Sequence, residues 1–89
     1  MRIEVHSKTD CPYCTKAKQW LTDRNIPFEL FVYDDDAERN AMYDGFALEG
    51  SDRTVPQIFV DGVRLGGYTK LVNSDVADRV NAGKFDEDF

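Results

Sequence analysis

The segment that most restricts the fold of this chain is Cys11-Pro12-Tyr13-Cys14, which stands between a predicted strand and a predicted helix. Residues 3–7 alternate apolar and polar side chains, a pattern typical of a short strand. Thr9 and Asp10 are typical helix-capping residues, and a proline in the positions that follow suits a first helical turn. The two cysteines are therefore predicted directly after a strand and at the start of a helix.

A second strand and a second helix follow the first helix. Apolar side chains recur at helical spacing from Cys14 to Leu21, and Asn25-Ile26-Pro27 ends that helix. Residues 28–33 are almost wholly apolar and aromatic, which predicts a strand covered on both faces. Residues 35–38 resemble a capping box, which predicts a second helix that runs to about Leu48.

Two short strands and a last helix complete the order. Residues 57–60 and 63–66 flank Asp61-Gly62, a two-residue turn of the kind that closes a tight hairpin. Thr69 is predicted to cap a last helix with apolar positions from Leu71 to Val80. A right-handed crossover makes the first two strands parallel, and the hairpin adds an antiparallel pair. The expected fold is α/β, in the order β-α-β-α-β-β-α, with a four-stranded mixed sheet and helices on both faces.

Length and composition favour one domain over residues 1–89. The 89 residues leave no room for a second core, and an apolar content of 42% argues against disorder. Both cysteines lie in one motif, whereas a small secreted domain would spread several disulfides along its chain. The start resembles no export peptide, and no run approaches the roughly 20 apolar residues of a membrane span. We therefore expect a cytoplasmic protein with no membrane partner.

The net charge of −6 restricts the partners further. Nucleic acid would be repelled by most of this surface, and no cluster of Lys or Arg offsets the repulsion, so no nucleic-acid partner is expected. Acidic residues concentrate at 34–36 and 86–88. We interpret both runs as solvated segments rather than as binding sites.

A cysteine at a helix start is well placed to act as a nucleophile. Unpaired backbone N–H groups and the positive end of the helix dipole both favour the thiolate over the thiol. Cys11 is therefore predicted to be the exposed attacking thiol. Cys14, one turn further in, is predicted to be the shielded resolving thiol. Lys8 adds positive charge nearby, whereas Asp10 opposes it.

The cysteine pair has three alternative origins that do not involve a nucleophile. A zinc site needs four ligands, and two cysteines with the single His6 do not supply them, so no metal is expected. Inert core cysteines have no need of a proline between them at a helix start. Chance can produce a Cys-X-X-Cys pattern alone, but strand, motif and helix together favour redox chemistry. We interpret His6 as a partly buried structural residue.

Two further loops favour a function in the company of the cysteine motif. Pro56 precedes a predicted strand, where an X-Pro bond is often cis and part of a tight turn. Such a loop would expose the backbone of Val55 for strand-like pairing with a bound peptide. Gly66-Gly67 lets a ligand approach the backbone closely, and the helix start that follows offers N–H groups to a carboxylate. Without the cysteine motif, an ordinary trans proline would be favoured for the first loop, and a plain turn would suit the second equally well.

Three segments together resemble the signatures of the dithiol glutaredoxin family: residues 8–14, residues 54–60 and residues 66–69 stand in the family's order and spacing. The similarity covers roughly residues 1–80. It implies a thioredoxin-like fold and a thiol–disulfide oxidoreductase that reduces protein disulfides and glutathione mixed disulfides, with glutathione as its reducing co-substrate. It also implies a monomer that acts on disulfide-containing proteins, with ribonucleotide reductase as a family expectation.

The resemblance also implies a glutathione site, residue by residue. Lys8 would meet the glycine carboxylate, the backbone of Val55 would pair with the cysteine moiety, and Arg53 would support a carboxylate. The other positions would line the groove or meet the glutamyl end: Tyr13, Thr54, Pro56, Gly67, Tyr68 and Thr69. Lys70 departs from the family pattern, which often has an acidic residue there to hold the glutamyl amine.

Three other functions stay open for a chain of this kind. One is an iron–sulfur cluster carrier bridged through Cys11 and glutathione, against which Pro12 counts because a stiff first turn leaves less freedom for ligation. Another is a non-catalytic adaptor with a thioredoxin fold. The third is a glutathione-independent, thioredoxin-like electron donor, whose relatives usually carry a Trp-Ser-Gly-Phe-type segment where this chain has Gly66-Gly67-Tyr68.

Overall fold

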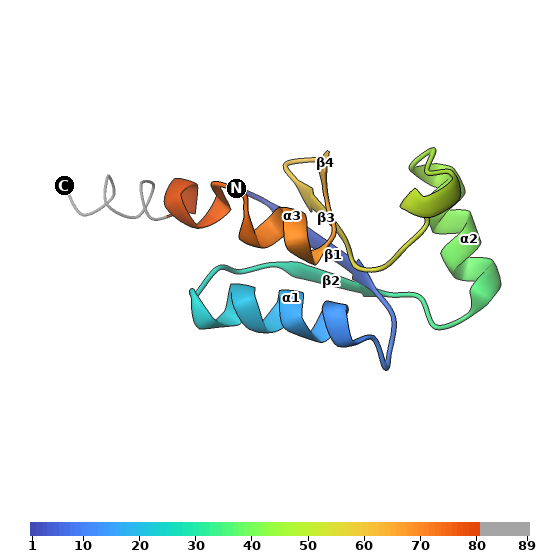
Figure 1. The fold of residues 1–89 in the computed structure, drawn as a ribbon, viewed down its shortest axis with the longest axis horizontal. Coiled ribbons are helices and arrows are strands. Elements are labelled where there is room, and N and C mark those ends of the chain that lie inside the picture. Colours follow the sequence, from blue (N-terminus) through green and yellow to red (C-terminus); the bar gives the residue numbers. More distant parts are fainter. Residues whose placement is uncertain (81–89) are drawn as a thin grey trace.

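The computed structural model describes residues 1–80, whose arrangement is shown in Figure 1. The elements are β1 (Ile3–Ser7), α1 (Pro12–Asp23), β2 (Glu29–Val32), α2 (Asp36–Gly45), the short 3-10 helix η1 (Gly50–Asp52), β3 (Gln57–Val60), β4 (Val63–Gly66) and α3 (Tyr68–Val72). Residues 76–80 are also helical. The predicted order of strands and helices is confirmed. The acidic run at 86–88 lies outside the described residues.

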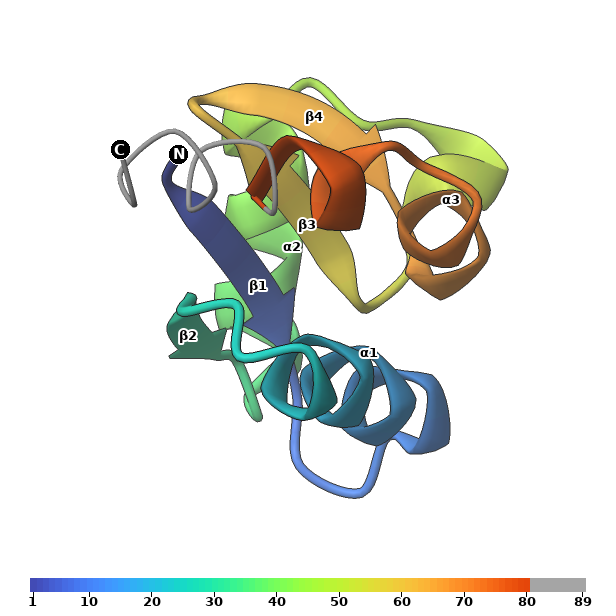
Figure 2. The same cartoon turned by 90° about the vertical axis from the view of Figure 1, so that its left-hand side faces the viewer.

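The four strands form one mixed sheet in the order β2-β1-β3-β4. β1 runs parallel to β2 and antiparallel to β3, and β3 pairs antiparallel with β4. The predicted hairpin turns at Asp61 and Gly62, which adopt φ values of 51° and 82°. Glycine and aspartate tolerate this left-handed conformation better than most residues do. Figure 2 shows α1 and α3 on the same side of the strands, with α2 behind them.

The main hydrophobic core lies between the sheet and these two helices. Ile3 and Val5 of β1 and Ile58 of β3 point into it because alternate residues of a strand share a face. Leu21 of α1 and Leu71 of α3 meet them from the helices, and both are fully buried. This packing fixes the start of α1 at one end of the sheet, where the cysteines lie.

The other face of the sheet carries a histidine among aromatic rings. His6 exposes only 4% of its surface. Its Nδ1 lies 2.8 Å from the Tyr33 hydroxyl and its Nε2 lies 3.1 Å from Glu4 Oε1. A neutral ring satisfies both contacts when Nε2 donates to the carboxylate and Nδ1 accepts from the hydroxyl. The surrounding rings are those of Phe31, Phe46 and Phe59. The predicted structural role of His6 is confirmed.

The expectation that the second strand is covered on both faces is wrong. β2 is an edge strand, and Leu30 and Val32 are 43% and 48% exposed. Within β2, Phe31 packs by stacking on His6, and Phe28, which precedes the strand, lies against the main core. A short apolar run does not distinguish an edge strand from a central one, because its place in the sheet depends on distant pairing partners.

The second helix is shorter than predicted and lacks the predicted capping box. α2 begins after Asp35, whose side chain makes no capping hydrogen bond, and it ends at Gly45 instead of Leu48. The chain turns there because Phe46 packs against the sheet, 5.1 Å from the His6 ring centroid and 4.3 Å from that of Phe59. Tertiary packing has ended the helix before its apolar pattern ends.

The last helix is interrupted, and its cap differs from the prediction. α3 begins after Gly67, not at Thr69, and it ends at Val72. Ser74 then donates its hydroxyl to the Leu71 carbonyl at 2.5 Å and accepts from the backbone N–H of Val76 at 3.3 Å. A serine that bonds to the backbone in this way ends one helical segment and opens the next. Leu71 and Val76 still reach one core.

Two kinds of feature are absent from residues 1–80, the part of the chain that the structure describes. Within residues 1–80, no helix is long and apolar enough to cross a membrane. The same residues contain no group of three or more His, Cys, Asp or Glu side chains that is suited to a metal ion.

Candidate active site

Cys11 and Cys14 form a disulfide at the start of α1. Cys11 is the N-cap residue, Pro12 occupies the first helical turn, and the two Cα atoms lie 5.2 Å apart. The backbone N–H of Cys14 points at Cys11 Sγ over 3.3 Å. Proline has no N–H, and at this position it removes no hydrogen bond of the helix. The N–H groups of the other first-turn residues have no partner within the helix, so they can stabilise negative charge on the sulfur.

The cap of α1 differs from the sequence prediction. Thr9 does not cap the helix; its backbone N–H and hydroxyl both donate to the carboxylate of Asp34, at 2.7 and 2.8 Å. These hydrogen bonds hold the pKa of Asp34 below its usual value. Asp10 adopts a φ of 57° and turns the chain into the helix. The sulfur of Cys11 therefore takes the position that a capping oxygen usually occupies.

The two cysteines differ in exposure less than predicted, although in the predicted direction. Cys11 exposes 7% of its surface and Cys14 exposes 1%, so both are buried in the disulfide form. The loop before β3 accounts for the cover over Cys11, because the carbonyl oxygen of Val55 lies 3.8 Å from its sulfur. The expectation of an openly exposed Cys11 is corrected: it is the more accessible thiol of a shielded pair.

The loop at Val55 has the predicted form. The Val55–Pro56 peptide bond is cis, and β3 begins directly after it at Gln57. Gln57 is fully buried, and its side-chain amide donates to the carbonyl oxygens of Asp52 and Thr54 at 2.9 and 2.8 Å. This amide ties the loop to the strand and so fixes the position of the Val55 carbonyl. Sequence reasoning missed Gln57, whose signal was a polar residue at the start of an apolar strand.

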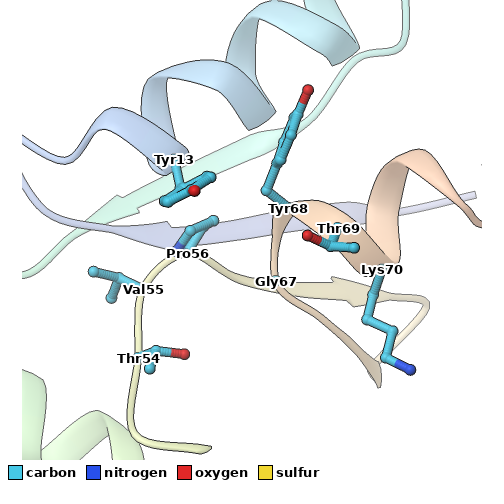
Figure 3. A pocket seen from close by; sticks show the side chains of 8 residues that line it. All are labelled: Tyr13, Thr54, Val55, Pro56, Gly67, Tyr68, Thr69 and Lys70. Atoms are coloured by element: carbon cyan, nitrogen blue, oxygen red, sulfur yellow. The ribbon is translucent and has the colours of Figure 1, made fainter.

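An open cavity of about 310 Å³ lies beside this loop, as Figure 3 shows. Its walls come from α1, the loop before β3 and the start of α3. The lining residues are Tyr13, Thr54, Val55, Pro56, Gly67, Tyr68, Thr69 and Lys70. The rings of Tyr13 and Tyr68 lie near each other, with centroids 6.1 Å apart and planes tilted by 39°. We call this cavity the groove.

Gly66 and Gly67 lead the chain from β4 into α3 beside the groove. A Cβ at Gly67 would lie 3.6 Å from the carbonyl oxygen of Pro56, an ordinary van der Waals contact. At Gly66, which has a φ of 127°, a Cβ would lie 2.9 Å from Cγ of Lys70. The stem of Lys70 therefore rests against the backbone of β4 at the edge of the groove. The φ of 127° accounts for glycine at 66, because few other residues adopt it; the prediction that the glycine pair lets a ligand approach the backbone stays a prediction.

The groove brings together seven of the nine residues predicted to contact glutathione, and it leaves out two. Lys8 is not among the lining residues. Arg53 points elsewhere: its Nε donates to the Leu48 carbonyl at 2.8 Å and its guanidinium pairs with Asp44. Arg53 is thus engaged in holding the segment after α2, a role that its position next to Thr54 does not reveal. Contact of the other seven with a ligand stays a prediction.

Sequence reasoning also missed Lys16. Its Nζ lies 5.0 Å from the centroid of the Tyr13 ring, a cation–π distance. The two residues are three apart on α1 and therefore share a helix face, which is the signal that the sequence offered. With Lys70, this places two cations around the tyrosines of the groove.

A disulfide at a helix start, next to a cis-proline loop and an open groove, is suited to exchange with disulfides brought in by a substrate. The fold and the site together define a thiol–disulfide oxidoreductase with a thioredoxin-like fold.

Comparison with known proteins narrows this class to a family. The glutaredoxin family model matches residues 3–65. Glutaredoxin-1 of Rhizophagus irregularis is 37% identical over 70 residues, which cover 79% of this chain and 69% of that protein. Mitochondrial glutaredoxin-2 of Homo sapiens is 37% identical over 67 residues, which cover 75% of this chain and 41% of that protein. The chain belongs to the glutaredoxin family.

Solved structures agree with this assignment. Glutaredoxin 1 from Francisella tularensis, crystallised with cacodylate, superposes with a TM-score of 0.76 at 36% identity, over 90% of this chain and 96% of that one. A buckwheat glutaredoxin solved in complex with glutathione superposes with a TM-score of 0.67 at 24% identity, over 85% of this chain and 68% of that one. The second similarity concerns the fold alone.

Proposed function

We propose that this protein reduces disulfides with electrons from glutathione, and that Cys11 is the attacking thiol. The observation that carries the proposal is the position of Cys11: it is the N-cap of α1 and the more accessible of the two thiols, next to the groove. Cys14 has only 1% of its surface exposed, which suits a thiol that reacts inside the protein.

The reaction consists of two exchanges. In the reduced protein, the Cys11 thiolate attacks one sulfur of a substrate disulfide, and the other substrate sulfur leaves as a thiolate that takes up a proton. Cys14 then loses its proton and attacks Cys11 Sγ, which releases the second substrate thiol and forms the Cys11–Cys14 disulfide. Two glutathione thiols return the pair to the dithiol and leave as glutathione disulfide, so that atoms and electrons balance.

The groove suits a small peptide thiol such as glutathione. Its volume of about 310 Å³ lies at the lower end of the range for small-molecule sites. The backbone of Val55 offers strand-like pairing, and Thr54 and Thr69 offer hydroxyls to a molecule with two carboxylates. A glutaredoxin of the same fold, that of buckwheat, has been solved in complex with glutathione.

The proposal also covers the location, the oligomeric state and the substrates of the protein. We infer a cytoplasmic monomer whose substrates are protein disulfides and glutathione mixed disulfides, with ribonucleotide reductase as a candidate. The wide opening of the groove, flanked by the exposed Tyr13, supports access by a protein chain.

Cysteine variants assayed with glutathione, glutathione reductase and NADPH test the roles. We expect Cys11→Ser to lose all exchange activity. Cys14→Ser should keep activity on glutathione mixed disulfides, because that reaction needs one thiol, and should lose activity on protein disulfides that require resolution. An inactive Cys14→Ser with an active Cys11→Ser would reverse the two roles. Absence of turnover in the unmodified protein would overturn the function.

A further inference from the structure

The acidic charge of the chain is concentrated around α2. Residues 34–52 contain seven carboxylates and one guanidinium, so this segment accounts for the whole net charge of −6 and the remaining residues balance. The carboxylates are those of Asp34, Asp35, Asp36, Glu38, Asp44, Glu49 and Asp52. A local excess of this size creates a negative potential that attracts cations and repels other acidic surfaces.

Part of this charge is neutralised and part is not. Arg39 pairs with Asp36, Arg53 pairs with Asp44, and Arg64 lies 4.0 Å from Asp52. Among residues 1–80, no ion pair involves Asp35, Glu38 or Glu49. All three are exposed, so their charge faces solvent.

An apolar hollow lies within this acidic segment. It has a volume of about 460 Å³ and is lined by Tyr33, Glu38, Ala41, Met42, Gly45 and Phe46. Phe46 is 38% exposed although it packs on His6, and Gly45 leaves space above the helix, since a Cβ there would meet no atom within 4 Å. The hollow shares no residue with the groove. Glu38 is its one charged lining residue.

We propose that this hollow is a docking surface for a partner protein that presents a large apolar side chain flanked by Lys or Arg. The apolar side chain enters the hollow, and the flanking cations lie near Glu38 and Asp35. Charge complementarity favours this partner over a second copy of the chain, which carries the same net charge of −6. A large apolar anchor with a charged rim is the usual form of a protein contact.

The test uses a synthetic peptide, acetyl-Lys-Arg-Trp-Arg-Lys-amide, titrated into the full chain by calorimetry and by NMR. We expect saturable binding, with shifts at Ala41, Gly45 and Phe46, that weakens with salt. Two matched peptides, one with Ala in place of Trp and one with Glu in place of each cation, should bind at least ~5-fold more weakly, as expected for an anchor and several charge contacts.

Two variants locate the site. Gly45→Leu fills the hollow with a side chain that meets open space, and Glu38→Lys reverses its charge. Each should weaken peptide binding by roughly 3- to 10-fold. Asp78→Lys makes the same charge change on the exposed surface of residues 76–80 and should leave binding unchanged. Unchanged circular dichroism spectra of all three variants verify that they fold.

Several results would overturn the proposal. These are no binding of the Trp peptide, equal binding of the three peptides, NMR shifts at the groove instead of α2, or equal weakening by Asp78→Lys. Concentration-dependent self-association with shifts at Ala41 and Phe46 would assign the surface to a second copy instead. None of these results depends on glutathione chemistry, so the proposed function stands or fails separately.

Discussion

Cys11 combines two roles at the start of α1, because it is both the cap of the helix and the proposed nucleophile. A capping side chain accepts hydrogen bonds from the first-turn N–H groups, and the sulfur receives one from Cys14 at 3.3 Å. The same N–H groups stabilise a thiolate when the disulfide is reduced. The local fold and the chemistry therefore require the same residue at this position.

Lys70 is the residue by which the groove differs from the family pattern. Its ammonium would lie near the glutamyl amine of bound glutathione, where like charges repel. We expect Lys70→Asp to lower the KM for glutathione by roughly 2- to 5-fold, as for one exposed charge contact, and more at low salt. Lys18→Asp makes the same charge change outside the groove and should have no such effect. A raised KM would mean that Lys70 binds a carboxylate instead.

His6 makes stability depend on pH in a predictable direction. Burial lowers the pKa of His6 from 6.5, so the unfolded chain binds a proton before the folded chain does as pH falls. The contribution of neutral His6 to the free energy of unfolding should therefore be fully present above pH 6.5. The free energy of unfolding should decrease as pH falls toward the lowered pKa. His6 is the only histidine, so NMR titration of its ring measures this pKa directly. A ring that titrates at or above 6.5 would contradict the burial argument.

At the scale of elements, α2 reaches the active site through a small cluster. Met42, Tyr43 and Leu48 are buried together, and Val55 packs against them. Because the Val55 carbonyl lies beside Cys11, this cluster supports the loop that shields the thiol. In Figure 1, α2 lies at the end of the sheet near that loop, away from α1 and α3.

Truncation of the cluster should affect the loop as well as stability. We expect Met42→Ala to reduce the free energy of unfolding by about 2 kcal/mol, the lower end for a buried methionine. Because the loop loses its support, the KM for glutathione should rise and the amide of Val55 should exchange faster with deuterium. Val63→Ala, an exposed truncation on β4, is the control. Unchanged KM and Val55 exchange in Met42→Ala would limit the cluster to a structural role.

Features that depend on adjacent residues were predictable from the sequence, whereas features that depend on distant residues were not. The hairpin at Asp61-Gly62 was predictable because its turn depends on two neighbouring residues. The position of the cysteines at a helix start was predictable for the same reason. The edge position of β2 and the early end of α2 at Phe46 were not, since each depends on a partner far along the chain. The engagement of Arg53 by Asp44, nine residues away, was not either, because it depends on how the chain folds back after α2.

Across the whole molecule, the excess negative charge lies away from the groove. The groove includes Lys70, and Lys16 lies over one of its tyrosines, whereas the segment at 34–52 carries the net negative charge. The surroundings of the groove thus do not share the acidic excess of the molecule as a whole. Composition alone conceals this separation, because net charge does not say where the charges lie.

Trapping of the mixed disulfide tests most directly whether Cys11 exchanges disulfides with glutathione. Cys14→Ser is incubated with glutathione disulfide and analysed by intact-mass and peptide mass spectrometry. We predict one glutathione adduct on Cys11, formed faster than the adduct on Cys14 in Cys11→Ser. Absence of an adduct on Cys11, or faster labelling of Cys14 in the reciprocal variant, would contradict the proposed role of Cys11.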